Sequence, residues 1–184
     1  MNAWQKFLEG DESSFAKLYG EFFHKLFAYG LKLGYDAEEC KDAIQDVFFT
    51  VYLSKNKLSH VLNIEFYLLR ALKNRLFDLS GQEKITELNH EHFELTHEEN
   101  VVDKIITNEK NELLKQEVKR RMNNLTIKQR KVLYYYYDLN LNHNEIATLL
   151  DITPDAVGKL RRRALKELKE KLKAFRNRVI SLFI

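Results

Sequence analysis

The sequence predicts an all-α protein: two small helical domains joined by a flexible acidic linker, the second containing a helix-turn-helix. Three observations support this prediction. Only 6 of the 184 residues are glycine and one is proline, so few positions break a helix. Apolar residues recur at three- and four-residue spacing, which is the period of an amphipathic helix. No alternating apolar–polar run is long enough to suggest a sheet.

Composition narrows the class of protein further. The chain is 45% hydrophobic and 31% charged, which suits helical domains with real cores. Its single cysteine, Cys40, excludes an internal disulfide and favours the reducing cytoplasm. The opening residues lack the pattern of a signal peptide, and no apolar stretch reaches membrane-spanning length. We therefore expect a cytoplasmic protein with no membrane insertion.

The first domain, residues 1–82, is expected to hold three substantial helices after a short opening one. Asp11 caps the first and Gly34 ends it. Its apolar face comprises Phe15, Leu18, Tyr19, Phe22, Phe23, Leu26, Phe27 and Leu31. An aromatic stripe at helical spacing is far more often core than a cofactor site, so we interpret it as core.

Two further helices complete this domain. Asp36 and Glu39 form a capping box that opens the second helix. A polar loop, Ser54–Asn63, leads to a third helix from about Ile64 to Leu79.

Charge divides the chain around an acidic segment. Residues 1–90 hold 11 Lys/Arg and 13 Asp/Glu, whereas residues 91–184 hold 19 and 14. Between these halves, residues 83–103 carry seven acidic residues and one lysine with weak periodicity, so we expect a linker there.

His90, His92 and His97 lie in this region. A metal site is the alternative to solvated side chains, but the linker composition favours solvation.

The second domain, residues 104–184, is expected to begin with a helix from about Val102 to Met122. Thr126 and Gln129 make another capping box. The four tyrosines from Tyr134 to Tyr137 cannot all be buried on one helix, so at least one should be exposed. Stacking on nucleotides is one role for it, and partial burial with a solvated hydroxyl is the favoured one.

The segment Asn142–Leu168 predicts a helix-turn-helix. Asn142 and Glu145 form a capping box for its first helix. Thr153 caps the second helix, and Pro154 occupies the first helical position, where its missing N–H costs nothing. Apolar side chains share one stripe of that helix: Val157, Leu160, Ala164, Leu168 and Leu172.

The second helix is strongly basic away from this stripe. From Ala156 to Arg178 there are ten Lys/Arg and two Asp/Glu, while the whole chain nets only +3. A packed hairpin with a solvated charged surface is the alternative, but such concentration is typical of phosphate contact. The residues expected to bind upstream DNA are Thr153, Asp155, Lys159, Arg161, Arg162, Arg163 and Lys166.

Four motifs in sequence order resemble the extracytoplasmic-function (ECF) group of sigma factors in the sigma-70 family of RNA polymerase. They are GDESSFAKLY from Gly10, DAIQDVFFTVY from Asp42, FYLLRALKNRLFD from Phe66, and the segment from Leu125 to Leu168 that includes the helix-turn-helix. Together they span nearly the whole chain. The resemblance implies a factor without catalysis or cofactor that docks on core RNA polymerase and binds double-stranded and melted promoter DNA.

The second motif is similar to the family's polymerase-docking helix. The residues expected to bind polymerase are Asp42, Gln45, Asp46 and Phe49. A polar, acidic helix face suits an arginine-bearing helical hairpin, and the resemblance implies the clamp helices of the largest polymerase subunit. Without the resemblance, a solvated face would be the preferred interpretation.

The loop and third helix carry cations, amides and an aromatic residue, which suit a melted strand. The residues expected to bind the downstream promoter element are Lys55, Lys57, His60, Asn63, Tyr67, Arg70, Lys73 and Asn74. The resemblance implies that the loop captures a flipped base. Asn74 has an equally weighted alternative as a helix-stabilising residue.

Two departures from the family pattern point to a different promoter sequence. The family usually has a basic pair after the position of Asp78, where this chain has Leu79 and Ser80. Gly158 lies inside the recognition helix, where glycine costs about 1 kcal/mol relative to alanine. Close approach of the backbone to DNA is one reason for it.

The alternative function is a helix-turn-helix regulator that binds DNA without being a polymerase subunit. The absence of an α/β receiver pattern argues against it. An enzyme has little support, because the chain has no Gly-rich phosphate loop and no nucleophile-and-base pattern. An anti-sigma factor is a partner that only the resemblance implies.

Overall fold

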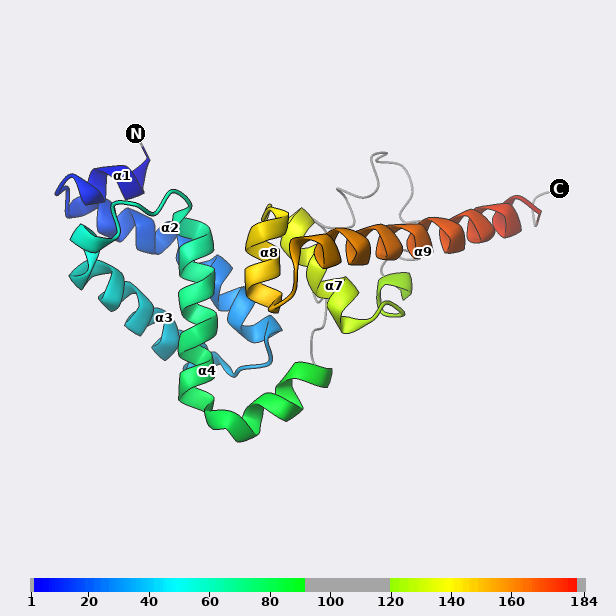
Figure 1. Ribbon diagram of the computed structural model, residues 1–184, viewed down its shortest axis with the longest axis horizontal. Helices are drawn as coiled ribbons and strands as arrows, with labels where there is room; N and C mark the ends of the chain where they lie inside the picture. The colour runs from blue at the N-terminus through cyan, green and yellow to red at the C-terminus, as the bar shows by residue number, and fades with distance from the viewer. Residues whose placement is uncertain (1, 92–119, 182–184) are drawn as a thin grey trace. The chain divides into compact units, whose positions relative to one another are not determined.

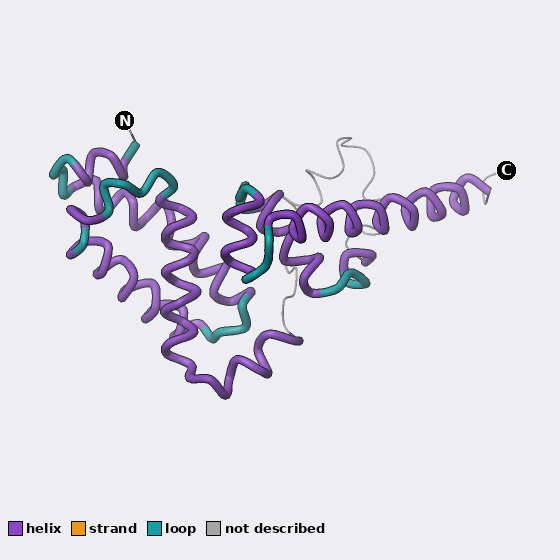
Figure 2. Tube along the Cα trace, viewed as in Figure 1, coloured by secondary structure: helices purple, strands orange, loops and turns teal. Residues whose placement is uncertain are grey.

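The computed structural model describes residues 2–91 and 120–181 (Figure 1), with side chains at 2–79 and 120–170. The chain divides into two compact units, Met1–Phe93 and Glu94–Ile184. Both described ranges consist of helices and loops with no β-strand (Figure 2), which confirms the predicted all-α class. The limits predicted for the linker, 83–103, stay a prediction.

The N-terminal unit is a bundle of three long helices with a short helix packed on it. Its elements are α1 (Ala3–Leu8), α2 (Ser13–Lys32), α3 (Ala37–Leu53), the 3-10 turn η1 (Lys55–Lys57) and α4 (Ile64–Glu91). Helices α2, α3 and α4 pack against one another, and α1 packs on α2. The wholly buried aliphatic side chains of these helices include Leu18, Leu26, Ile44, Val51, Leu68, Leu69, Leu72 and Leu76.

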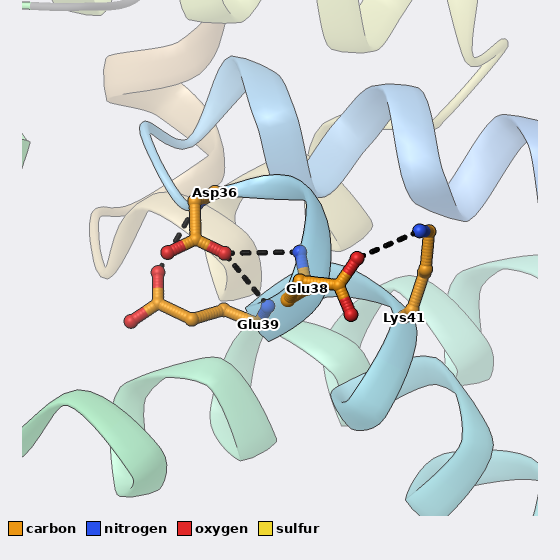
Figure 3. A network of polar contacts seen from close by, with 4 residues as sticks. All are labelled: Asp36, Glu38, Glu39 and Lys41. Atoms are coloured by element: carbon orange, nitrogen blue, oxygen red, sulfur yellow. Dashed lines mark hydrogen bonds and ion pairs between the residues drawn. The ribbon is translucent and has the colours of Figure 1, made fainter.

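Local signals in the sequence place the ends of these helices. Gly34 has φ +95°, and its neighbour Tyr35 donates its backbone N–H to the Gly30 carbonyl over 3.3 Å, closing α2 as predicted. Figure 3 shows the start of α3, where the Asp36 carboxylate accepts from the backbone N–H groups of Glu38 and Glu39 over 2.9 Å each. The Glu39 carboxylate accepts in return from the Asp36 N–H over 3.1 Å. This confirms the capping box.

Asp11 caps the turn that leads into α2. Its carboxylate accepts from the hydroxyls of Ser13 and Ser14 over 2.6 and 2.7 Å, and from the Ser13 N–H over 3.0 Å. The two serine hydroxyls lower the pKa of Asp11 to about 2. The cap therefore remains ionised at neutral pH.

The aromatic stripe of α2 lies on its packed side. Phe22 is buried, while Phe23 and Phe27 are half-buried and stack with ring centroids 5.9 Å apart. Two residues depart from the prediction: Tyr19 is 38% exposed, and Leu31, at the last turn of the helix, is 42% exposed.

Helix α4 is longer than the sequence indicates. The predicted end at Leu79 is wrong, since the helix continues to Glu91 and takes in residues 83–91 of the predicted linker. Polar residues do not break a helix by themselves, and no proline interrupts this stretch, so α4 continues through Ser80 and Gly81. The predicted helix Val102–Met122 lies mostly outside the described residues, and only 120–122 are seen to be helical.

Gly30 allows α2 and α3 to approach closely. A Cβ added there would lie 2.5 Å from Sγ of the buried Cys40. Burial, with Asp36 and Glu39 nearby, raises the pKa of the Cys40 thiol to about 12. The thiol is thus neutral at physiological pH and packs as a small apolar group.

The C-terminal unit packs two short helices against one long helix. Its elements are α7 (Ile127–Leu133), the π-helical turn η2 (Tyr134–Asp138), α8 (His143–Leu150) and α9 (Pro154–Ser181). Both α7 and α8 pack on α9. Thr126 and Gln129 form the predicted capping box at the start of α7.

The π-helical turn explains the four tyrosines. Tyr134 and Tyr135 are both buried, and Tyr136 and Tyr137 are half-buried. None of the four is fully exposed, as one was expected to be, but the two half-buried rings agree with the favoured interpretation of partial burial. A π turn holds one more residue than an α turn, so it changes the direction of successive side chains and lets two adjacent rings enter the core.

Candidate promoter and polymerase interfaces

The helix-turn-helix of the C-terminal unit is built from local hydrogen bonds. The Asn142 side chain accepts from the N–H groups of Asn144 and Glu145 over 2.9 and 3.1 Å. The turn closes at Asp151, which has φ +53°, and the Ile152 N–H donates to the Ala147 carbonyl over 3.1 Å. These bonds confirm the predicted first helix and fix the direction in which α9 leaves the turn.

Thr153 acts as the N-cap of α9. Its hydroxyl accepts from the Ala156 N–H over 3.2 Å, and Pro154 takes the first helical position. The structure thus gives Thr153, an expected DNA-binding residue, a capping role within its own chain.

Burial on one side of α9 leaves a basic side exposed. Val157, Ala164 and Leu168 are buried, as predicted, and Leu160 is half-buried. Four exposed cations line a shallow groove of about 330 Å³ on the helix surface. These residues, named here the cationic face, are Lys159, Arg162, Arg163 and Lys166.

Asp155 also belongs to the exposed side of α9. Its carboxylate pairs with Lys159 Nζ over 2.7 Å, and this hydrogen bond and charge lower the pKa of Asp155. The pair joins exposed side chains one turn apart, so it stabilises the helix only slightly. Its main effect is to keep a carboxylate next to Lys159, which is the first residue of the cationic face along α9.

Arg161 stands apart from the other arginines. Its guanidinium carbon lies 4.0 Å from the ring centroid of Tyr136, and the Tyr136 ring lies 5.8 Å from His143. Arg161 is half-buried, and its Nε has no hydrogen-bond partner among the described residues. This cation–π contact ties α9 to η2, so Arg161 lies outside the cationic face.

Gly158 lies beside His143, the first residue of α8. A Cβ there would lie 3.6 Å from Cε1 of His143, which is an ordinary contact distance. Packing within the unit therefore does not require glycine at this position.

In the N-terminal unit, the residues expected to bind polymerase lie along one side of α3. Asp42 and Gln45 are exposed, and Phe49 exposes 62% of its surface. Asp46 differs, because its Oδ2 accepts from Nε of Arg75 over 2.8 Å and lies 2.7 Å from the terminal nitrogen. Its carboxylate therefore already has a partner on α4.

Two hollows lie along α3 and α4. The first, of about 400 Å³, is lined by Asp46, Val47, Phe49, Thr50, Tyr67, Ala71, Asn74, Arg75 and Asp78. The second, of about 640 Å³, is lined by Asp36, Glu38, Glu39, Asp42, Gln45, Asp46, Arg75 and Leu79. They share Asp46 and Arg75, and we name them together the acidic groove.

The acidic groove brings together residues predicted for two different partners. Tyr67 and Asn74, expected to bind DNA, line it beside Asp46 and Phe49, expected to bind polymerase. The second hollow is lined by five carboxylates and one arginine, so its charge suits a basic partner. The first hollow, which Tyr67 and Asn74 line, has two carboxylates and one arginine, and Arg75 pairs with one of them.

The remaining residues expected to bind the downstream element lie on the loop and on α4. Lys57, His60, Asn63 and Arg70 are exposed. Lys73 is half-buried, and Lys55 is half-buried with Nζ 5.5 Å from the ring centroid of Phe7.

Sequence reasoning missed two exposed apolar residues near these sites. Leu53, on the last turn of α3, exposes 67% of its surface, and Leu62, in the loop, exposes 98%. Leu53 follows Phe49 by four residues, so helical spacing alone would have placed both on one side. Nothing in the local sequence separates Leu62 from the buried Leu58 and Ile64 beside it.

Neither a metal-ligand cluster nor a membrane-spanning helix is present among the described residues. Within the ranges that the structure describes, no three His, Cys, Asp or Glu side chains come together as metal ligands. His92 and His97 lie outside those ranges, as does the side chain of His90. The helices of the described part include none that is both long and apolar enough to cross a bilayer.

Comparison with known proteins agrees with this geometry. Residues 115–168 match the family model described as "Sigma-70, region 4", which contains the whole of α7, η2 and α8 and the first half of α9. A search of curated proteins found no match.

Two solved structures are similar to the chain. The first is described as the structure of CnrH in complex with the cytosolic domain of CnrY; it is 16% identical, with 94% of this chain and 96% of that chain covered and a TM-score of 0.53. The second, described as the RsbN–BldN complex, is 12% identical, with 91% and 97% covered and a TM-score of 0.39. The chain and the CnrH structure therefore share a fold over nearly the whole chain.

Residues 115–168, which include the helix-turn-helix, are therefore similar to region 4 of the sigma-70 family, in the part of the chain that carries the fourth motif.

Proposed function

We propose that the protein is a sigma factor of the ECF group that binds core RNA polymerase and directs promoter-specific initiation of transcription. The observation that carries this proposal is the region 4 match on a helix-turn-helix whose recognition helix presents the cationic face. Helices of this kind enter the DNA major groove with their N-terminal residues toward base edges. The cytoplasm, where polymerase and DNA meet, is the proposed place of action.

In this proposal α9 reads the upstream promoter element. Arg162 and Arg163 are exposed and can turn toward phosphates or guanine edges, for which arginine has matching bidentate geometry. Lys159 and Lys166, at the two ends of the cationic face, supply phosphate contacts. We assign Thr153 and Arg161 indirect roles, because the first caps α9 and the second packs on Tyr136.

The acidic groove is the proposed docking site for polymerase. Asp42, Gln45 and Phe49 offer an exposed aromatic ring next to carboxylate and amide groups. An arginine-bearing helical hairpin complements this surface in both charge and polarity. Asp46 would contribute while keeping its ion pair with Arg75, which supports α4 behind it.

The loop and the exposed cations beside it are the proposed contact for the melted downstream element. Lys57, His60, Asn63 and Arg70 offer charges and an amide to a single strand. Tyr67 and Asn74 lie in the acidic groove, so a substitution there is expected to affect polymerase docking as well as DNA.

An anti-sigma factor is a further proposed partner. The similar structure of CnrH is recorded in complex with the cytosolic domain of CnrY, and its likeness covers both units of this chain. A protein inhibitor that contacts either interface would block initiation.

The direct test is transcription in vitro with purified core polymerase, genomic DNA and the full chain, followed by sequencing of the transcript 5′ ends. A sigma factor produces discrete start sites that share upstream and downstream elements and that core polymerase alone does not produce. Start sites unchanged by the chain would contradict the proposal and favour the alternative of a regulator that only binds DNA.

A further inference from the structure

The carboxylates of the acidic groove are not equally available to a partner. Asp36 and Glu39 accept from backbone N–H groups at the start of α3, and Glu38 pairs with Lys41 over 2.8 Å (Figure 3). Asp42 is exposed, and no described residue forms a hydrogen bond or ion pair with its carboxylate. Most of the negative charge that lines the second hollow is thus already engaged within the chain.

Two carboxylates of the groove pair with side-chain cations, and the two pairs are built differently. Lys41 lies three residues from Glu38 on the same helix, and these side chains are 52% and 80% exposed. Arg75 instead reaches Asp46 from α4, and these side chains are 41% and 48% exposed. A pair within one turn of an exposed helix is weak, whereas the packing of two helices holds a less exposed pair together. The Arg75–Asp46 pair is therefore the more persistent of the two.

Two nitrogens of Arg75 contact the same oxygen of Asp46. Nε donates to Oδ2 over 2.8 Å, and the terminal nitrogen Nη2 lies 2.7 Å from the same atom. The other oxygen, Oδ1, has no hydrogen-bond partner among the described residues. An arginine binds a free carboxylate most strongly through two parallel N–H bonds, one to each oxygen. With Oδ2 occupied, Asp46 offers an incoming arginine only one of these two oxygens.

Arg75 lies where the two hollows of the acidic groove meet. Like Asp46, it lines both hollows, and no other cation belongs to the described lining of either. The partner proposed for this groove is a basic helical hairpin, and like charges brought together at an interface oppose binding. Arg75 therefore opposes docking in two ways, because its own charge repels the partner's cations and its nitrogens occupy one oxygen of Asp46.

We propose that Arg75 is a built-in restraint on polymerase docking: an intramolecular competitor for the carboxylate of Asp46 that lowers the affinity of the acidic groove for its basic partner. This inference rests on the proposed function and adds to it an affinity-limiting residue on α4, outside the docking helix. The pair contributes little to stability, because both side chains are about half exposed. A restraint predicts a gain of affinity when Arg75 is removed, whereas a residue needed for structure or for contact predicts a loss.

The test is a titration of the labelled full chain with purified core polymerase at moderate salt. Arg75→Met keeps an unbranched stem and removes the guanidinium. It is expected to raise the affinity by about fivefold, which is less than a fully buried charge pair contributes because Asp46 is half exposed. Lys17→Met is the control, since Lys17 is an exposed cation of α2 that does not line the groove, and it should leave the affinity unchanged. Thermal unfolding of each variant verifies that it is folded.

Two further variants separate the release of Asp46 from a change of net charge. Lys41→Met also removes one positive charge beside the groove, but it frees only the weakly held Glu38, so the affinity should rise by less than about twofold. Asp46→Asn keeps the shape of the side chain and removes the charge for which Arg75 competes. In the Asp46→Asn background, Arg75→Met is expected to raise the affinity no more than Lys41→Met does in the unsubstituted chain.

Three results would overturn the inference. An unchanged or lower affinity for the folded Arg75→Met variant would show that Arg75 supports docking or takes no part in it. Equal gains for Arg75→Met and Lys41→Met, or a full gain from Arg75→Met in the Asp46→Asn background, would show that net charge alone sets the affinity. Failure of the proposed function is recognised separately, because the unsubstituted chain would then not bind core polymerase at all.

Discussion

The exposed sides of helices α3 and α9 carry charges of opposite sign, so each suits a different kind of partner. Along α3 the acidic groove gathers carboxylates with an exposed Phe49, whereas α9 presents four cations over a buried aliphatic stripe. Both helices use one apolar side for packing, so the difference lies wholly in the exposed residues. A mixed polar and aromatic surface suits a protein, and a uniformly cationic one suits a polyanion.

The largest effect should come from reversing charge in the acidic groove. Asp42→Arg places a cation where a basic hairpin is expected to dock, and opposing like charges cost several kcal/mol. We expect at least a tenfold loss of affinity for core polymerase, measured by titration with labelled protein. Asp42 is a better position than Asp46, whose substitution would also break the ion pair with Arg75.

Glu21→Arg is the matched control for this prediction, because Glu21 is an exposed acidic residue of α2 that does not line the acidic groove. An Asp42→Arg variant that binds polymerase as well as the control does would remove the acidic groove from the interface.

The next effect concerns the cationic face. Arg162→Ala or Arg163→Ala should weaken binding to the upstream element by about tenfold where a base contact is lost, since a bidentate pair is worth about 1–3 kcal/mol. If a phosphate contact is lost instead, the slope of affinity against salt should fall by about one. Fluorescence anisotropy at several salt concentrations distinguishes the two.

Lys128→Ala is the control, since Lys128 is an exposed cation of α7 outside the cationic face. Thermal unfolding should be unchanged in all three variants. An affinity equal to that of the control for both arginine variants would mean that this side of α9 does not face DNA.

The two units also differ in how closely a neighbouring helix approaches a helical glycine, Gly30 in the N-terminal unit and Gly158 in the C-terminal unit. Gly30→Ala would place a Cβ 2.5 Å from Cys40 Sγ, and overpacking of this kind costs about 1–3 kcal/mol of unfolding free energy. Combining it with Cys40→Ala removes the clashing atom, so urea titration should show that the double variant is more stable than the sum of the single changes predicts. Additive losses would show that the sulfur is not the obstacle.

The smallest effect is expected at Gly158. Alanine there has room beside His143, so Gly158→Ala should raise the unfolding free energy by up to about 1 kcal/mol through helix propensity. If the backbone of α9 lies close to DNA at this point, the same variant will bind the upstream element more weakly. A stability gain with unchanged DNA affinity would exclude that close approach.

Local signals in the sequence predict most of the fold. The capping boxes at Asp36, Thr126 and Asn142 each form as expected, because a cap depends only on residues three positions apart. The length of α4 and the π-helical turn at Tyr134 do not follow from such signals. The length of α4 depends on where nothing ends the helix, and the π-helical turn depends on how its rings pack. Neither can be read from a few neighbouring residues of the sequence.

The candidate sites were predicted less completely. Periodicity places Arg162 and Lys159 on the exposed side of α9, but it does not reveal that Arg161 stacks on Tyr136. The pairing of Asp46 with Arg75 and the support of the loop by Trp4 join residues 29 and 57 positions apart. Contacts of that separation arise from tertiary packing and need the folded chain.

The most direct test of the central claim is to measure both kinds of binding for two variants side by side. Asp42→Arg and the double variant Arg162→Ala/Arg163→Ala are titrated with core polymerase and, separately, with an upstream promoter fragment. We predict a crossed pattern: the first loses polymerase and keeps DNA, and the second loses DNA and keeps polymerase. The account would be contradicted if each folded variant lost both kinds of binding, or if neither variant lost either kind. The two units would then not bind polymerase and DNA separately.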